Sequence, residues 1–128
     1  MERFILALDQ GTSSSRALIY DHHGKVISIA QQTIGMSHPK DGWVEQDPNE
    51  IWDSVLATGR EAITNSGIEP KFIKGIGITN QRETTLVWNK KTGQCVYNAI
   101  VWQDRRTLKT CVEMDSATLD GKVLSEQI

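Results

Sequence analysis

The sequence predicts an α/β fold, and three observations support this class. Residues 4–31 contain three strand-like segments that are joined by tight turns. A helix with clear start and stop signals follows between Pro48 and Gly67. Another strand-like run, from Phe72 to Thr79, comes after the helix. With 128 residues, of which 38% are hydrophobic, the chain is large enough to bury a hydrophobic core.

The first three strands predict an antiparallel meander. Residues 4–8 form a continuous apolar run, which is typical of a central strand buried on both faces, and Asp9 follows at its carboxyl end. After a polar segment, residues 16–20 resume a strand-like composition. Turn formers at 21–24 then lead to a third strand over 25–31. Such short connections join neighbouring antiparallel strands.

The helix between Pro48 and Gly67 is marked at both ends. Asp47 is a preferred N-cap residue, and Pro48 has a fixed φ that suits the first helical position. Glu50 lies three residues after the cap and completes a capping-box pattern, while Gly67 ends the helix. The apolar residues expected on one face are Ile51, Trp52, Val55, Leu56, Ala62 and Ile63.

The second half of the chain predicts further short elements. Residues 72–79 are expected to form another buried strand. Residues 84–88 and 95–101 flank a polar loop and predict a hairpin. A helical period begins at Asp104, and a turn at 120–121 precedes a final run that stops without a helix cap.

Composition excludes several classes of function. The net charge is −2 and the lysines and arginines are scattered, so nucleic acid is not expected as a partner. No apolar run approaches the ~20 residues of a membrane helix and no signal peptide is present, so we expect a cytoplasmic protein without membrane contact. Cys95 and Cys111 lack the neighbouring ligands that a zinc site requires and are expected to be free thiols.

The segment after the first strand has the chemistry of a phosphate site. Asp9 offers a metal-attracting carboxylate at the carboxyl end of that strand. Gly11 permits a tight turn whose backbone N–H groups converge, and the small hydroxyls of residues 12–15 add donors. Arg16 follows and is suited to neutralise phosphoryl charge. This combination suits a nucleotide with Mg²⁺; the alternative is an ordinary serine-rich turn.

A second group of polar residues follows the strand over 72–79. Arg82 donates hydrogen bonds and Glu83 accepts them, which is the pairing that adjacent hydroxyls of a polyol require. Trp102 offers an apolar wall for a carbon chain. The alternatives are an exposed ion pair at a strand end and a tryptophan in the core.

Three separated segments resemble one family of enzymes. Residues 7–16, ALDQGTSSSR, resemble the phosphate motif of the carbohydrate kinases of the actin and hexokinase superfamily, to which the FGGY family belongs. Residues 42–48, GWVEQDP, and residues 77–85, GITNQRETT, are similar to the members of that family that phosphorylate glycerol. Related pentulose kinases usually lack the Asn-Gln-Arg-Glu run. The resemblance extends from Phe4 to about Leu124.

The resemblance implies a fold and a domain organisation. The fold is a ribonuclease H-like mixed sheet flanked by helices, as in actin and hexokinase. We expect residues 1–128 to be the N-terminal part of the first actin-like domain, with the second domain absent from this chain. The general base, an aspartate, would then lie beyond Ile128. We therefore expect no catalytic residue and no activity in this chain alone.

The resemblance also assigns roles to single residues. It implies that Asp9 is associated with Mg²⁺. The residues that it implies for nucleotide binding are Gly11, Thr12, Ser13, Ser14 and Arg16. It further implies that Arg82 and Glu83 bind glycerol hydroxyls, with Trp102 packed against the carbon skeleton.

These roles lead to one expected function and two alternatives. We expect the complete protein to transfer the γ-phosphoryl group of ATP to glycerol, giving sn-glycerol 3-phosphate, with Mg²⁺ as cofactor, and to form a homo-oligomer. One alternative is a related pentulose or erythritol kinase. The other is a non-catalytic nucleotide-binding module of actin type, which would share the phosphate hairpin without the Arg82–Glu83 pair.

Overall fold

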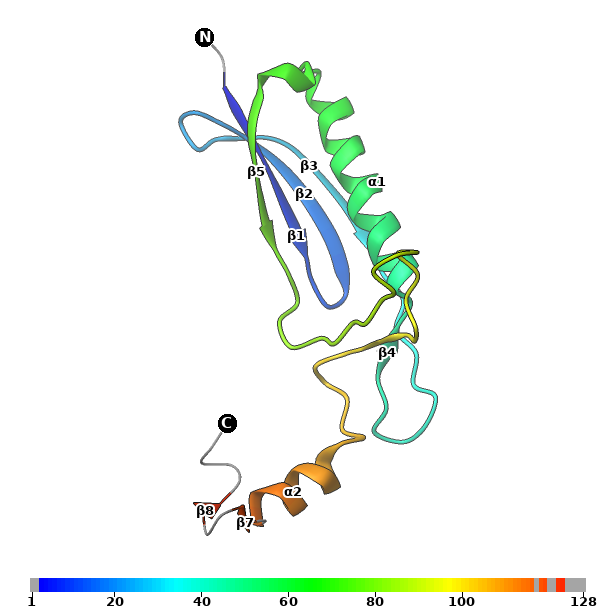
Figure 1. Cartoon of the computed structure of the whole chain (residues 1–128). Helices are drawn as coiled ribbons and strands as arrows, with labels where there is room; N and C mark the ends of the chain where they lie inside the picture. The colour runs from blue at the N-terminus through cyan, green and yellow to red at the C-terminus, as the bar shows by residue number, and fades with distance from the viewer. Residues whose placement is uncertain (1–2, 117, 120–121, 124–128) are drawn as a thin grey trace.

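The structure is a computed structural model, and it describes residues 3–116, 118–119 and 122–123. Figure 1 shows a sheet with one long helix beside it and a second helix at a distance from both. The elements in chain order are β1 (Phe4–Gln10), β2 (Ser14–Asp21), β3 (Val26–Thr33), β4 (Glu45–Gln46), α1 (Pro48–Ser66), the 3₁₀ turn η1 (Pro70–Phe72), β5 (Ile73–Thr79), β6 (Ala99–Ile100), α2 (Leu108–Ser116), β7 (Thr118–Leu119) and β8 (Lys122–Val123). The turn predicted at 120–121 lies outside the described residues.

The main sheet is mixed and has the strand order β3-β2-β1-β5. The predicted meander is confirmed, because β2 pairs antiparallel with both β1 and β3. β5 pairs parallel with β1 on the other side. Parallel strands have their carboxyl ends at the same edge of a sheet. The β1–β2 turn and the segment that follows β5 therefore lie at the same end of the molecule (Figure 1).

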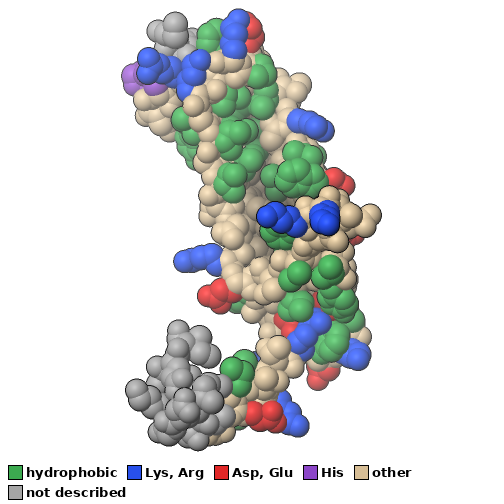
Figure 2. All heavy atoms as spheres, viewed as in Figure 1, with side chains coloured by type: hydrophobic (Ala, Val, Ile, Leu, Met, Phe, Trp, Pro, Cys, Tyr) green, Lys and Arg blue, Asp and Glu red, His purple; other side chains and the backbone are tan. Residues whose placement is uncertain are grey.

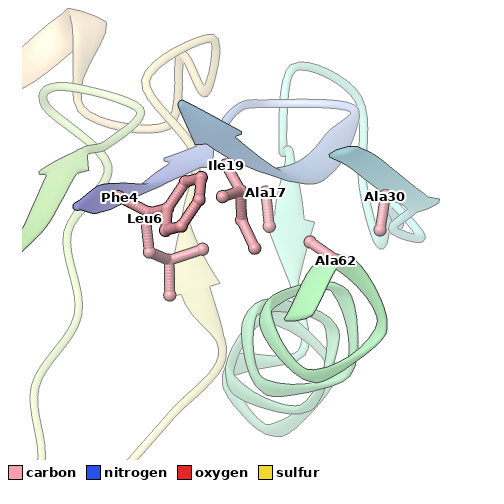
Figure 3. Packing of buried hydrophobic residues seen from close by; sticks show 6 residues of the cluster. All are labelled: Phe4, Leu6, Ala17, Ile19, Ala30 and Ala62. Carbon is pink, nitrogen blue, oxygen red and sulfur yellow. The ribbon is translucent and has the colours of Figure 1, made fainter. Parts of the chain in front are cut away.

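The core lies between the sheet and α1 (Figure 3). Its buried residues are Phe4, Leu6, Ala17, Ile19, Ala30 and Ala62. Burial alternates along β1, where Phe4 and Leu6 are buried but Ile5 is 44% exposed. The prediction of a strand buried on both faces is therefore wrong for this chain. Among the described residues, α1 covers one face of the sheet and leaves the side chains of the other face open.

The two ends of α1 follow the predicted caps. A side-chain oxygen of Asp47 accepts a hydrogen bond from the backbone N of Asn49 at 2.8 Å, and Gly67 adopts the left-handed conformation with φ 67°. The predicted capping box is wrong in its second half. Oε1 of Glu50 accepts a 2.7 Å hydrogen bond from the backbone N of Gly35, so this side chain joins the preceding loop to the helix instead.

The buried face of α1 differs from the predicted apolar stripe. Trp52 is 63% exposed, and the buried residues of the helix are Ser54, Thr58, Gly59 and Ala62. These side chains are small, so the helix backbone comes close to the sheet. Ser54 Oγ lies 2.7 Å from Ser15 Oγ of β2, and this contact satisfies two hydroxyls that are both buried.

β5 is a strand as predicted, but its burial was predicted wrongly. Ile76 and Ile78 are 61% and 76% exposed. The reason is that α1 packs mainly against β2 and β3, whereas β5 lies at the edge of the described sheet, beyond β1. Figure 2 shows hydrophobic side chains exposed over the part of the molecule that contains the sheet. A sequence pattern of this kind reports an apolar strand without reporting which elements cover it.

The segment between β5 and α2 is less regular than predicted. The expected hairpin is reduced to isolated antiparallel bridges, Thr85 with Ile100 and Trp88 with Cys95. β6 pairs with β4 in a separate small sheet. α2 confirms the predicted helical period, although it begins at Leu108 rather than near Asp104. In the described part of the chain, no helix combines the length and the apolar character that crossing a membrane requires.

Candidate functional site

We call the turn between β1 and β2, with the residues on either side of it (residues 9–16), the phosphate hairpin, after the role that the sequence predicts for it. The backbone N of Gly11 donates to the carbonyl of Ser14 at 2.9 Å, which closes the turn tightly. A Cβ atom at Gly11 would lie 3.1 Å from that carbonyl, so the turn requires glycine or a small shift. Ser13 is exposed and Ser14 is half-buried, which leaves small hydroxyls at the surface of the turn.

Asp9 and Arg16 face each other across the hairpin. They are register partners in β1 and β2, and Nη2 of Arg16 lies 2.6 Å from Oδ2 of Asp9. Their side chains are 34% and 47% exposed, respectively. An ion pair in such an exposed position adds little stability, so its residues are free to exchange partners at small cost.

Trp102 contacts the phosphate hairpin directly. Its indole Nε1 donates a 2.9 Å hydrogen bond to Oγ1 of Thr12. Its backbone N donates to Oγ1 of Thr84 at 3.2 Å. Trp102 is 53% exposed, so the alternative of a tryptophan in the core is excluded and the ring is open to a ligand. Trp102 therefore joins the hairpin to the segment that follows β5.

Arg82 and Glu83 form an exposed turn just beyond β5. Glu83 has φ 67°, the left-handed conformation that residues with a side chain seldom adopt. The flanking residues close this turn, because Oγ1 of Thr84 donates to Oε1 of Gln81 at 2.9 Å. We call residues 81–84 the Arg82–Glu83 turn. Its strained backbone and closing hydrogen bond fix where the two charged side chains leave the chain.

Two buried glutamines connect this turn with the phosphate hairpin. Gln81 and Gln46 are 8% and 2% exposed. Nε2 of Gln81 donates to Oε1 of Gln46 at 2.8 Å, and Nε2 of Gln46 donates to the carbonyl of Thr12 at 2.6 Å. A weaker contact of 3.3 Å joins Gln81 Nε2 to Oε1 of Gln10. We call Gln10, Gln46 and Gln81 the glutamine network.

A cluster of charges holds the segment that carries Trp102. Glu45 accepts hydrogen bonds from Asn98 at 3.0 Å, Tyr97 at 2.8 Å and Arg106 at 2.9 Å. Asp104 accepts from Arg106 and, at 2.7 Å, from the backbone N of Val44. The side chains of Glu45 and Asp104 are each 3% exposed. The cluster therefore attaches the residues on both sides of Trp102 to β4.

The pKa values of this cluster follow from its hydrogen bonds. The Asn98 amide, followed by Tyr97 and Arg106, lowers the pKa of Glu45 below its ordinary value. The Arg106 guanidinium holds the pKa of Asp104 well below its usual range. The same contact with Asp104 raises the pKa of Arg106. All three groups are thus charged at neutral pH, and the cluster is a fixed ionic attachment.

The residues present fit a Mg²⁺ ion that is held largely by nucleotide phosphates. Mg²⁺ in proteins binds commonly through one or two carboxylates and through substrate phosphates. Asp9 supplies one partly exposed carboxylate beside the hairpin. Within the ranges that the structure describes, no three His, Cys, Asp or Glu side chains are grouped so that they would hold a metal ion by themselves. A site shared with phosphate is the arrangement that this donor set suits.

The structure brings together most of the residues that the sequence singled out. Asp9 pairs with Arg16, and Thr12 contacts Trp102. The Arg82–Glu83 turn is connected to both through its flanking residues. Sequence reasoning missed Gln46, Gln81 and Thr84. The two glutamines lie inside the segments 42–48 and 77–85, so polar residues adjacent to the predicted site residues were the available signal.

An open groove lies elsewhere on the molecule. Its volume is about 600 Å³, and it is found at the N-terminal end of α1. The lining residues are Asp47, Pro48, Asn49, Gln94, Cys95, Val96, Tyr97 and Asn98. None of the predicted site residues lines it, so this groove is separate from the candidate site.

The mixed sheet with its serine-rich β1–β2 hairpin defines a class of protein, the sugar kinases with the actin and hexokinase type of fold. Comparison with known proteins agrees. The FGGY family of carbohydrate kinases, N-terminal domain, matches residues 4–127. The chain therefore belongs to the FGGY family of carbohydrate kinases.

Individual relatives narrow the comparison. The chain is 52% identical over 122 residues to a glycerol kinase of Burkholderia cenocepacia, covering 95% of this chain and 24% of the relative. The crystal structure of Plasmodium falciparum glycerol kinase with ADP superposes with a TM-score of 0.85 at 34% identity, covering 91% and 24% of the two chains. A xylulose kinase from Rhodospirillum rubrum superposes with a TM-score of 0.76 at 26% identity, covering 89% and 24%. The chain thus spans about a quarter of the length of these proteins.

Proposed function

We propose that this chain is the N-terminal part of an ATP-dependent kinase that phosphorylates glycerol. The hydrogen bond between Trp102 and Thr12 carries the proposal. It joins the tryptophan that is expected to pack against the carbon chain of glycerol to the phosphate hairpin. The identity of 52% to a glycerol kinase supports the choice of substrate. The match covers only 24% of the length of that relative. This supports the proposal that residues 1–128 belong to the first actin-like domain, and that other segments supply the general base and the adenosine pocket.

In this proposal the phosphate hairpin binds the phosphates of ATP. The backbone N–H groups of the turn and the hydroxyls of Thr12, Ser13 and Ser14 are donors without bulk. Arg16 places a guanidinium at the same hairpin, where it compensates phosphoryl charge. Asp9 would hold Mg²⁺ together with the phosphates, and a bound ion would supply further compensation of phosphoryl charge. The exposure of Asp9 and Arg16 supports this role.

The Arg82–Glu83 turn is proposed to bind the hydroxyls of glycerol. Arg82 donates to hydroxyl oxygens and Glu83 accepts their protons, so two adjacent hydroxyls are held in one orientation. The exposed face of the Trp102 indole packs against the carbon chain. Positioning of this kind supplies much of the rate in phosphoryl transfer, because the reaction depends on alignment and charge compensation.

Steady-state kinetics of the complete protein test this assignment. Glu83→Ala is expected to raise the KM for glycerol by at least about tenfold, because a site built to pair hydroxyls discriminates strongly when a partner is lost. The KM for ATP should stay close to the wild-type value. Glu61→Ala, at an exposed position of α1, is the matched control. Equal glycerol KM values in Glu83→Ala and wild type would refute the role of Glu83.

A second candidate function is phosphorylation of a pentulose. The superposition with a xylulose kinase supports this possibility, since the two proteins share a fold over 89% of this chain. Activity of the complete protein across glycerol, erythritol and xylulose separates the two functions. A non-catalytic module of actin type is distinguished by calorimetry, because it should release no heat with glycerol in the absence of ATP.

The proposal includes a cytoplasmic location and self-association of the complete protein. Cys95 and Cys111 are free thiols in the structure, and Cys111 is exposed, which suits a reducing compartment. Cell fractionation tests the location, and light scattering of the purified complete protein tests whether it is a homo-oligomer.

A further inference from the structure

The hydrogen bonds around the site form a closed ring that begins and ends at Thr12. One side runs from the Thr12 carbonyl through Gln46 to Gln81. The other side runs from Thr12 Oγ1 through Trp102 to Thr84. The bond from Thr84 to Gln81 closes the ring. The ring thus joins the phosphate hairpin, β4, the Arg82–Glu83 turn and the Trp102 segment.

Gln81 has a special place in this ring because it uses both ends of its amide. Its Nε2 donates toward Gln46 and its Oε1 accepts from Thr84. The side chain is 8% exposed, and a buried amide without such partners would be strongly disfavoured. The amide therefore has a single satisfied orientation. It connects the turn that carries Arg82 and Glu83 with the carbonyl of Thr12 through one intermediate residue, Gln46.

The left-handed backbone of Glu83 indicates that the Gln81–Thr84 bond fixes the conformation of the turn. A residue with a side chain adopts φ 67° only where its surroundings impose it. Gln81 and Thr84 bracket Arg82 and Glu83 and bond to each other across them. Arg82 and Glu83 are themselves exposed, so their direction depends on this bracket rather than on packing.

We propose that Gln81 and Gln46 are positioning residues, which hold the Arg82–Glu83 turn at a fixed place relative to the phosphate hairpin. The inference rests on the proposed function, because it requires that the turn holds an acceptor hydroxyl and that the hairpin holds the phosphoryl donor. The two glutamines touch neither substrate nor phosphate in this scheme. They act by keeping the acceptor aligned with the donor, and a small misalignment costs a large part of the rate.

Gln81→Met in the complete kinase tests the inference. Methionine keeps the length and volume of the side chain but removes its hydrogen bonds with Gln46 and Thr84 and the weaker one with Gln10. We expect the KM for glycerol to rise and kcat to fall, with kcat/KM for glycerol reduced by at least about tenfold, since the two strong hydrogen bonds and the weaker one are lost. The KM for ATP is expected to stay within about twofold. Gln32→Met, at an exposed position of β3, is the control that receives the same substitution.

A merely structural role predicts a different result. Loss of stability alone lowers the fraction of active enzyme, and hence kcat, while the glycerol KM of the remaining enzyme is unchanged. Thr84→Val provides a second test if Gln81→Met does not fold, because it removes the Thr84–Gln81 bond from the other partner. A glycerol KM within about twofold of wild type in both variants, or an equal change in Gln32→Met, would overturn the inference.

Failure of the proposed function can be distinguished from failure of this inference. If the proposed function is wrong, the wild-type protein will phosphorylate neither glycerol nor another polyol of the panel. If the wild type prefers another polyol, the same comparison of KM and kcat is made with that acceptor, and the inference stands or fails on the ratio between variant and wild type.

Discussion

The indole Nε1 of Trp102 donates a 2.9 Å hydrogen bond to Oγ1 of Thr12, which lies 90 positions earlier in the chain. This bond crosses from the segment after β5 to the β1–β2 turn. Trp102, which is proposed to contact the polyol, is therefore bonded directly to Thr12, which is proposed to contact phosphate. The Trp102–Thr12 bond therefore joins the two halves of the candidate site directly, and a substitution that removes this bond should affect both halves.

Trp102→Phe tests this connection. Phenylalanine keeps an aromatic face but lacks the N–H donor. In the complete kinase we expect the KM values for both glycerol and ATP to rise, each by up to about fivefold, because one neutral hydrogen bond contributes about 1 kcal/mol. Steady-state kinetics measure both values. Trp88→Phe, at an exposed position in the same segment, is the control, and equal effects of the two substitutions would contradict the prediction.

Asp9→Asn tests the proposed role in Mg²⁺ binding. The substitution keeps the size of the side chain and removes its charge. We expect the Mg²⁺ concentration for half-maximal activity to rise by about tenfold or more, since contacts to a charged group are worth about 1.5–3 kcal/mol. Stability in urea should change by less than about 1 kcal/mol, because the ion pair with Arg16 is exposed.

The control for Asp9→Asn is Asp53→Asn, which removes a carboxylate from an exposed position of α1. It should alter neither the Mg²⁺ dependence nor the fold. If Asp9→Asn retains the wild-type Mg²⁺ titration curve, the assignment of Asp9 to the metal is wrong.

The backbone of Glu83 gives a prediction about stability that is independent of activity. At φ 67° a side chain costs about 1 kcal/mol relative to glycine. Glu83→Gly should therefore be more stable than Glu83→Ala by about 1 kcal/mol. The order should be reversed in α1, where Glu61→Gly is expected to be less stable than Glu61→Ala by about 1 kcal/mol. Urea unfolding of the four variants measures both differences, and the same order at both positions would contradict the prediction.

The cluster around Arg106 predicts a dependence of stability on pH. Glu45 and Asp104 have ordinary pKa values of 4.5 and 3.8, and both are lowered in the folded protein. Groups with lowered pKa values stabilise the fold above their ordinary pKa values and lose that contribution as the pH falls below them. We expect the free energy of unfolding to decrease from about pH 5 toward about pH 2.

Arg106→Met identifies the source of this pH dependence. The variant should be less stable than wild type at neutral pH, because two buried carboxylates lose their cation. Its stability should also change less between neutral and acidic pH. Urea unfolding at several pH values measures both effects. A pH profile parallel to that of wild type would show that the acid sensitivity arises elsewhere.

Helix α1 and the meander could be predicted because their signals are local. Asp47 and Gly67 act on neighbouring backbone groups, and the turns of the meander involve a few adjacent residues. The burial of β5 could not be predicted in the same way. Ile76 and Ile78 have the composition of a buried strand, and their exposure depends on which elements lie beside them. The capping box predicted for Glu50 was wrong for a related reason, because the distant backbone N of Gly35 donates to this side chain instead.

The residues of the candidate site could be predicted from the sequence, because residues 9–16 and 82–83 are contiguous segments whose side chains suit phosphate and hydroxyl binding. The arrangement of these segments in space could not be predicted. The contacts of Thr12 with Gln46 and Trp102 join positions that are 34 and 90 residues apart. Such contacts arise when parallel β1 and β5 place their carboxyl ends at one edge of the sheet and when the Glu45–Arg106 cluster returns the chain to that edge. Local propensities act over a few residues, whereas the packing of the whole chain determines which distant hydrogen-bonding groups meet.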